Sequence, residues 1–136
     1  MRIMVRATRC RPGLRTLYNL RSWMGIRSVH MSDVKVTVDP GVCKLGTVIN
    51  AKMSDDMMHV DFQVESACPH INKLAQEVKS VEYMDVMGKN MLENPFYQAA
   101  AKCCPHAACP VPCAFNKALE VAADLGLKRN VEFKIE

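Results

Sequence analysis

Residues 103–113, CCPHAACPVPC, contain four cysteines, one histidine and three prolines within eleven positions. The same Cys-Pro-His order occurs once earlier in the chain, at Cys68-Pro69-His70. Cysteine thiolates are soft ligands that suit zinc and iron–sulfur clusters, and they are also nucleophiles. The chemistry that this composition offers is therefore metal binding or thiol-based catalysis.

Cys68 and Cys109 each precede a proline at a position where the pattern predicts the start of a helix. Cysteine is not a favoured helix cap, so helix stability alone does not explain the choice. A helix N-terminus favours the thiolate, and proline stiffens the backbone that would hold a ligand. The candidate metal ligands, of which at most four would bind one cluster, are Cys43, Cys68, Cys104, His106, Cys109 and Cys113.

The remaining cysteines and histidines have other expected roles. Cys103 falls at the apolar spacing of a helix and is expected to be a buried structural thiol. His70, on the first turn of a helix, and His59, on the wet face of a strand, are expected to be surface residues. Cys10 lies in an N-terminal segment that is set apart from the fold.

Three other uses of the thiols stay open. Structural disulfides are disfavoured by the odd count of seven cysteines and by the lack of an apolar secretory segment in residues 1–30. Structural zinc in an interaction module is a stronger rival, although the local C-x4-C-x3-C spacing lacks the usual C-x2-C knuckle. A redox or catalytic protein would use Cys68 or Cys109 with a histidine as base, but no family-specific nucleophile motif accompanies them. An enzyme is the less favoured class.

The hydrophobic pattern predicts the elements that would position these residues. Val34 to Val38 alternates as a short strand, and residues 45–53 and 58–66 form a hairpin. Helices are expected to begin at Pro69 and at Pro95, and a third is expected to end at Gly126. A last strand is expected over Val131, Phe133 and Ile135, whereas residues 81–93 fit helix or loop equally. The expected fold class is α+β, with a small antiparallel sheet of three to four strands and about three helices on one face.

Charge divides the chain into two parts. The net charge of the 136 residues is +4, but residues 1–30 contain seven arginines and no acidic residue. The eleven basic and fourteen acidic residues that remain give the rest a charge of about −3, which argues against nucleic acid as a partner. No apolar run approaches the roughly 18 residues of a membrane span.

Residues 1–30 fit an organellar transit peptide, a basic tail that contacts a partner, or an extension upstream of a true start at Met31. We therefore expect one cysteine-rich domain over residues 31–136. The expected location is the cytoplasm, or the mitochondrion if residues 1–30 are a transit peptide.

The order of these motifs resembles the iron–sulfur cluster scaffold family of the IscU and NifU N-terminal type. A cysteine precedes a hairpin, another opens a helix, and a His/Cys group opens the last helix, over residues 34–125. The resemblance implies an IscU-like sandwich whose ligands are Cys43, Cys68, His106 and either Cys109 or Cys113. It also implies protein partners that donate or accept a cluster.

The chain departs from that family at Leu45, where the scaffolds have an aspartate, and in the separation of His106 from Cys109. The chaperone-binding Leu-Pro-Pro-Val-Lys segment is missing as well. The S-x-C-P and H-x-x-C-P-x-P elements also look like those of a small group of uncharacterised cysteine-containing proteins of anaerobic microbes.

The sequence thus favours an intracellular metal-binding domain that holds or carries an iron–sulfur cluster, with zinc as the alternative. This interpretation requires that the thiols of Cys43, Cys68 and Cys109, which are far apart in the chain, meet at one end of the sheet.

Overall fold

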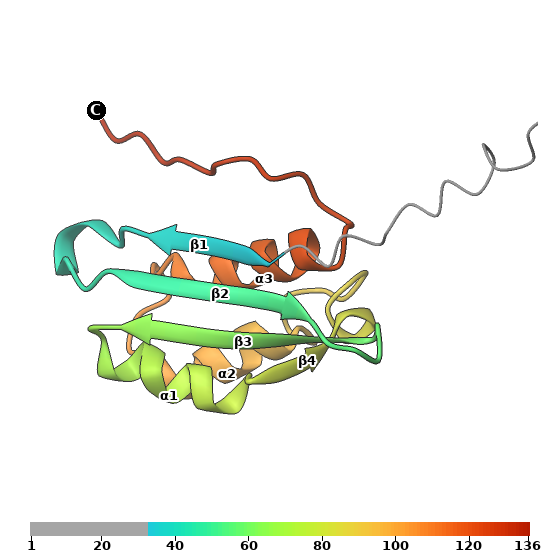
Figure 1. Ribbon diagram of the computed structural model, residues 1–136. Helices are drawn as coiled ribbons and strands as arrows, with labels where there is room; N and C mark the ends of the chain where they lie inside the picture. Colours follow the sequence, from blue (N-terminus) through green and yellow to red (C-terminus); the bar gives the residue numbers. More distant parts are fainter. Residues whose placement is uncertain (1–32) are drawn as a thin grey trace, which may run out of the picture.

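The structure, a computed structural model, describes residues 33–136 as a four-stranded antiparallel sheet with three α-helices (Figure 1). The strands, in sheet order, are β1 (Val34–Val38), β2 (Thr47–Met53), β3 (His59–Ser66) and β4 (Ser80–Glu82). The helices are α1 (Pro69–Glu77), α2 (Pro95–Cys103) and α3 (Val111–Ala122), and two 3-10 turns are η2 (Gly41–Cys43) and η3 (Tyr83–Asp85). The expected α+β class is confirmed. The arginine-rich segment 1–30 and Cys10 lie outside the described residues.

One face of the sheet is buried because its strands alternate as expected. Along β2, Thr47, Ile49, Ala51 and Met53 are buried, while Lys52 between them is exposed. The antiparallel register pairs Ile49 with Val36 on one side and with Val64 on the other, so apolar residues meet across neighbouring strands. Helix α3 packs against β1 and β2, and α1 packs against β3.

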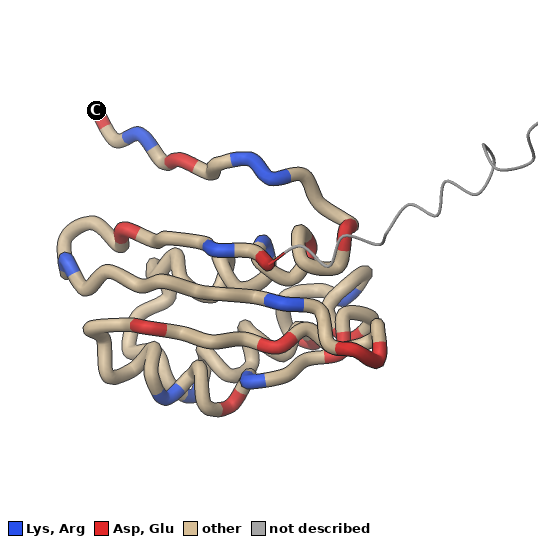
Figure 2. The backbone as a smooth tube through the Cα atoms, viewed as in Figure 1, with Lys and Arg blue, Asp and Glu red and all other residues tan. Residues whose placement is uncertain are grey.

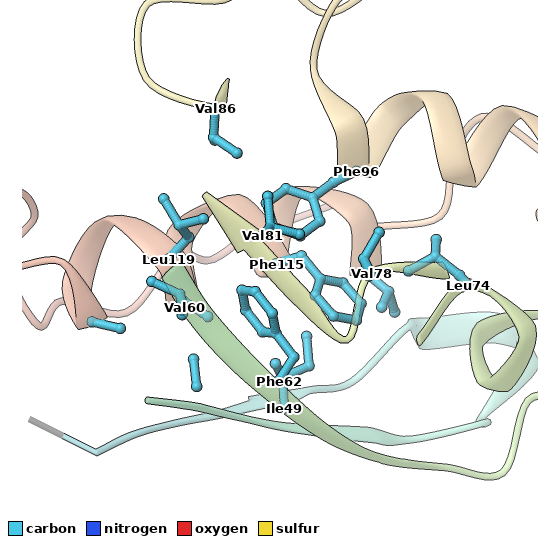
Figure 3. Packing of buried hydrophobic residues seen from close by; sticks show 14 of the residues in the cluster. Ile49, Val60, Phe62, Leu74, Val78, Val81, Val86, Phe96, Phe115 and Leu119 are labelled. Carbon is cyan, nitrogen blue, oxygen red and sulfur yellow. The ribbon is translucent and has the colours of Figure 1, made fainter. Parts of the chain in front are cut away.

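Three phenylalanines join the sheet to the helices (Figure 3). Phe62 of β3, Phe96 of α2 and Phe115 of α3 have ring centroids 5.4–5.5 Å apart in all three pairs. This separation is the one that favours aromatic contacts. Phe96 and Phe115 are fully buried, so the aromatic cluster fixes α2 and α3 relative to the sheet.

The helices begin where the sequence indicates. Cys68 is the N-cap of α1 and Pro69 is its first residue; the cysteine side chain makes no capping hydrogen bond. Asn94 caps α2, and its side-chain oxygen accepts the backbone N–H groups of Phe96 and Tyr97. The side-chain amide of Asn94 also donates to Asn116 of α3 at 2.6 Å, which ties the two helices together.

The C-terminal expectations are wrong in two respects. Helix α3 ends at Ala122, because Asp124 adopts a positive φ of 57°. The N–H groups of Leu125 and Gly126 then both donate to the carbonyl of Glu120 and cap the helix. Leu125 therefore lies beyond the helix and is exposed. Residues 131–135 form no strand in this structure.

The undecided segment 81–93 is neither one helix nor one loop. It begins inside β4, continues through η3 and then turns toward α2. Within residues 33–136, no helix is long and apolar enough to cross a membrane.

Candidate functional site

Three junctions of the chain lie at the same end of the sheet (Figure 1). They are the β1–β2 loop that contains Cys43, the β3–α1 junction that contains Cys68, and the segment between α2 and α3. Thr47 pairs with Val38 and with Ser66 at this end, and the hydroxyl oxygens of Thr47 and Ser66 are 2.7 Å apart. The antiparallel topology thus brings these distant parts of the sequence to one edge, as expected.

Four thiols gather there, and we call them the thiol cluster: Cys68, Cys103, Cys104 and Cys109. All four are half-buried and none is in a disulfide. They come from the start of α1, the end of α2 and the approach to α3. Cys104 is their common neighbour, because the other three thiols all contribute to raising its pKa.

The pKa of the Cys104 thiol is raised to about 11, first by burial. The negative charges that Cys109, Cys103 and Cys68 would carry as thiolates, and a hydrogen bond with Cys109, contribute to the same rise. Each additional thiolate in such a group makes the next ionisation harder. Several thiols of the cluster therefore ionise together only at a high electrostatic cost unless a cation stabilises them.

Backbone and side-chain hydrogen bonds hold the cluster in place. The Nδ1–H of His70 in α1 donates to the carbonyl oxygen of Cys103 at 3.0 Å, across 33 residues of sequence. The N–H of Cys68 donates to the Ser66 hydroxyl at 3.1 Å, and the N–H of Cys104 donates to the Ala100 carbonyl at 2.7 Å. His70 is thus a half-buried residue that joins two cysteine-bearing elements, whereas its position in the sequence indicated a surface role.

Cys113 lies in different surroundings. Its thiol lies near the hydroxyl of Tyr97, whose pKa is raised by burial and then by the charge of Cys113. A cavity of about 300 Å³ borders Cys113, Tyr97 and Lys117. Cys113 lies on the first turn of α3 and acts on Tyr97, so we do not count it in the thiol cluster.

Cys43 and His106 are exposed. Cys43 ends the turn η2 in the β1–β2 loop, at the same end of the sheet as the thiol cluster. Of the three thiols that the sequence required to meet, the structure gathers Cys68 and Cys109. Among residues 33–136, no group of three or more His, Cys, Asp or Glu side chains is already arranged to hold a metal ion.

Two members of the site were missed from the sequence. Cys103 was assigned to the core because it follows Phe96, Ala99 and Ala100 at helical spacing, yet it is half-buried and lies beside Cys104. The signal that could have found it is its position at the last residue of α2, where the helix no longer covers the side chain. His70 carried no comparable signal, because its partner is a backbone carbonyl from another helix.

The two chain segments that carry the cluster contain no charged residue, although Lys73 and Lys102 directly flank them. Residues 103–113 and residues 66–72 contain no Asp, Glu, Lys or Arg. A thiolate formed here has no lysine or arginine from either segment to neutralise it. Any cation that does so must come from outside these segments.

Comparison with known proteins places the chain in a family without assigning an activity. No curated protein and no solved structure matches it. The resemblance to the iron–sulfur scaffolds therefore stays a prediction. A family model does match residues 34–135, which covers the sheet, the three helices and almost all of the C-terminal segment. The chain belongs to DUF6951, a family of unknown function.

Proposed function

We propose that this protein binds a thiophilic metal centre, an iron–sulfur cluster or a zinc ion, through the thiol cluster. The observation that carries the proposal is the gathering of four half-buried thiols from three chain segments around Cys104. Thiolates suit zinc and iron–sulfur clusters in preference to magnesium or calcium. Four sulfurs match the ligand number of a structural zinc site and of a common iron–sulfur cluster.

The chemistry of the four donors fits such a group. The thiols are costly to ionise beside one another, and a bound cation reverses that cost by stabilising every thiolate at once. The side chains that we expect to bind are Cys68, Cys104 and Cys109, with Cys103 as the fourth. Because the unliganded thiols are not yet arranged as a metal site, we expect binding to draw segment 103–109 inward and to order it.

The role of the rest of the chain follows from these positions. Pro69 and Pro105 each follow a cysteine of the cluster and restrict the backbone there. His70 holds the end of α2 against α1 through Cys103. A bound iron–sulfur cluster would supply electron-transfer capacity or serve as cargo for a protein partner, whereas zinc would only stabilise the fold.

The experiment is anaerobic reconstitution of the full chain with iron and sulfide, and separately with zinc. The readouts are bound metal, acid-labile sulfide and the visible absorption spectrum. We expect the Cys68→Ser, Cys104→Ser and Cys109→Ser variants to lose most of the metal. Cys43→Ser and Cys113→Ser are the matched controls, because both thiols lie outside the cluster, and they should bind as the parent does. A folded parent that takes up neither metal would refute the proposal.

A second function is favoured by the contact between Cys104 and Cys109. Two neighbouring thiols can be oxidised to one disulfide, releasing two protons and two electrons to a disulfide substrate that becomes two thiols. The raised pKa of Cys104 disfavours it as the attacking group, so Cys109 would attack. Incubation of the metal-free protein with an oxidised low-molecular-weight disulfide, followed by mass spectrometry, tests whether a Cys104–Cys109 bond forms without loss of fold.

A further inference from the structure

The C-terminal segment, residues 127–136, has the pattern of a strand but joins no sheet in the structure. Val131, Phe133 and Ile135 are apolar and alternate with Glu132 and Lys134. The three apolar side chains are 61%, 77% and 96% exposed. An alternating segment with so much exposed apolar surface has one face suited to burial against another layer.

Strand β1 offers an edge that is open within the described part of the chain. It pairs with β2 on one side, and no strand of residues 33–136 pairs with it on the other. Val36 and Val38 of β1 and Val121 of the underlying α3 are only partly buried. A strand added to this edge would satisfy the free N–H and C=O groups and could cover this apolar surface.

Charge selects one way of pairing the C-terminal segment with β1. With Val34 opposite Phe133 and Val36 opposite Val131 in an antiparallel ladder, Lys35 lies opposite Glu132. In the same register Asp33 lies opposite Lys134, so a second pair of opposite charges forms. Opposite charges directly across a ladder are stabilising, and like charges are destabilising.

The other registers that keep the apolar faces together are worse. Shifting the antiparallel register by two residues one way places Lys35 opposite Lys134. Shifting it the other way places Asp33 opposite Glu132. In the parallel arrangement that starts with Val34 beside Val131, Asp39 comes to lie beside Glu136. The first antiparallel register also places Asp39 opposite Lys128, so it makes three opposite-charge pairs with no like-charge pair. The parallel arrangement with Val36 beside Val131 makes two such pairs, Asp33 with Lys128 and Asp39 with Lys134.

The chain's own C-terminal segment is directed away from that register. The hydrogen bonds from Leu125 and Gly126 to the Glu120 carbonyl fix the direction in which the chain leaves α3. The chain is closely packed there, because a Cβ at Gly126 would come within 3.0 Å of the Glu120 Cβ. From there the segment runs in the same direction as β1 (Figure 1). Antiparallel pairing within one chain would require the segment to reverse, whereas a second copy can present it in the correct direction.

We propose that two copies of this chain form a symmetric dimer by exchanging their C-terminal segments, each of which adds as an antiparallel strand to the β1 edge of the other copy. The exchange is reciprocal and closed, so no open edge of β1 is left for further growth. The family match extends to residue 135 and therefore includes this segment.

The test is analytical ultracentrifugation of the full chain over a range of concentrations, with a reductant and a chelator present. These additives remove intermolecular disulfides and bridging metal, so the result is independent of the proposed metal site. We expect a concentration-dependent dimer. Phe133→Asp should weaken it on the order of a hundredfold, while circular dichroism shows an unchanged fold.

Charge reversal tests the register itself. Lys35→Glu and Glu132→Lys should each weaken the dimer about tenfold, and the double variant should recover most of the loss. Lys73→Glu, a reversal on the exposed face of α1, is the matched control and should change nothing. A parent that stays monomeric at every concentration overturns the proposal, and so does a dimer that Phe133→Asp leaves intact. Single reversals that the double variant does not rescue would overturn it as well.

Discussion

The two ends of the sheet carry different chemistry, and the difference lies in how their ionisable groups are satisfied. The end with the β2–β3 turn and β4 is acidic, with Asp55, Asp56, Asp61, Glu82 and Asp85 (Figure 2). The opposite end contains the thiol cluster. Both ends concentrate one kind of acidic group, so like-charge repulsion is a common problem.

At the acidic end, the carboxylates find donors within the protein. Asp56 accepts the backbone N–H groups of Met58 and His59 at 2.9 and 3.0 Å, and these bonds lower its pKa to about 2. The hydroxyl groups of Ser54 and Ser80 both donate to Asp61 at 2.6 Å and lower its pKa. These charged groups are stable without a ligand.

At the thiol end, the shift in pKa has the opposite direction and disfavours the ionised form. The pKa of Cys104 is raised to about 11 by burial and by three neighbouring thiols. Donors within the protein stabilise the ionised carboxylates at the acidic end, whereas the ionised form of Cys104 is disfavoured at the thiol end. The proposed metal function rests on this contrast, because a bound cation would stabilise the thiolates that the protein itself does not.

The largest expected effect that separates the two ends is metal-dependent stability. A ligand present at about a thousand times its dissociation constant stabilises the folded state by about 4 kcal/mol. We expect zinc or a reconstituted cluster to raise the melting temperature of the parent, and Cys104→Ser to abolish that rise. Asp61→Asn is the control, because it alters the acidic end, and metal should raise its melting temperature as much as that of the parent. An equal rise in the parent, Cys104→Ser and Asp61→Asn would contradict the distinction between the two ends.

The aromatic cluster supports both ends and gives the next effect. Phe115 is fully buried between Phe62 and Phe96. Phe115→Ala should reduce the free energy of unfolding by about 3–5 kcal/mol, measured by urea denaturation. Phe133→Ala is the matched control, since Phe133 is exposed, and in dilute protein it should cost little. If both changes cost the same, the assigned core is wrong.

A smaller effect on stability is expected from replacing His70. The same variant shows whether His70 positions the cysteines or binds the metal itself. His70→Ala removes the hydrogen bond to the Cys103 carbonyl and should reduce the free energy of unfolding by about 1 kcal/mol. Metal affinity should fall about tenfold, because the end of α2 is held less firmly. A complete loss of metal, measured by competition with a chelator, would instead make His70 a ligand.

The smallest effect concerns the His59–Asp56 pair at the acidic end. The two side chains are 2.5 Å apart and exposed, and the hydrogen bond to Asp56 raises the pKa of His59. The stability from His59 is therefore fully present below its unfolded pKa of about 6.5 and is lost as the pH rises through the folded pKa. The stability that Asp56 contributes is present above pH 3.8, its unfolded pKa, and is lost as the pH falls toward its folded pKa of about 2.

An NMR titration of the His59 ring checks this directly. In Asp56→Asn the midpoint should move down toward the ordinary histidine value, because the hydrogen bond that raises the pKa of His59 is lost. An unchanged midpoint would show that Asp56 does not set the charge of His59.

Much of the fold could be predicted because its signals are local. The Val34–Val38 alternation, the hairpin and the prolines at residues 69 and 95 each place an element within a few residues of its observed bounds. The short strand β4 could not be foreseen, because its three residues are fixed by pairing with β3 and not by a pattern of their own. The end of α3 depends on the positive φ of Asp124, which nothing in the residue type required.

The site could be predicted only in part, for a related reason. Topology correctly places Cys43, Cys68 and Cys109 at one end of the sheet, because antiparallel strands return there. Which thiols then touch depends on side-chain direction, which separates Cys113 toward Tyr97 and leaves Cys43 in solvent. Tertiary packing decides these directions, and sequence spacing does not encode them.

The most direct measurement is cysteine-by-cysteine alkylation of the full chain, read by mass spectrometry with and without bound metal. We expect metal to protect Cys68, Cys103, Cys104 and Cys109 together, while Cys43 and Cys113 react equally in both states. Protection of Cys43 or Cys113 in place of the cluster, or no protection of any thiol by iron–sulfur reconstitution or zinc, would contradict the proposed metal site.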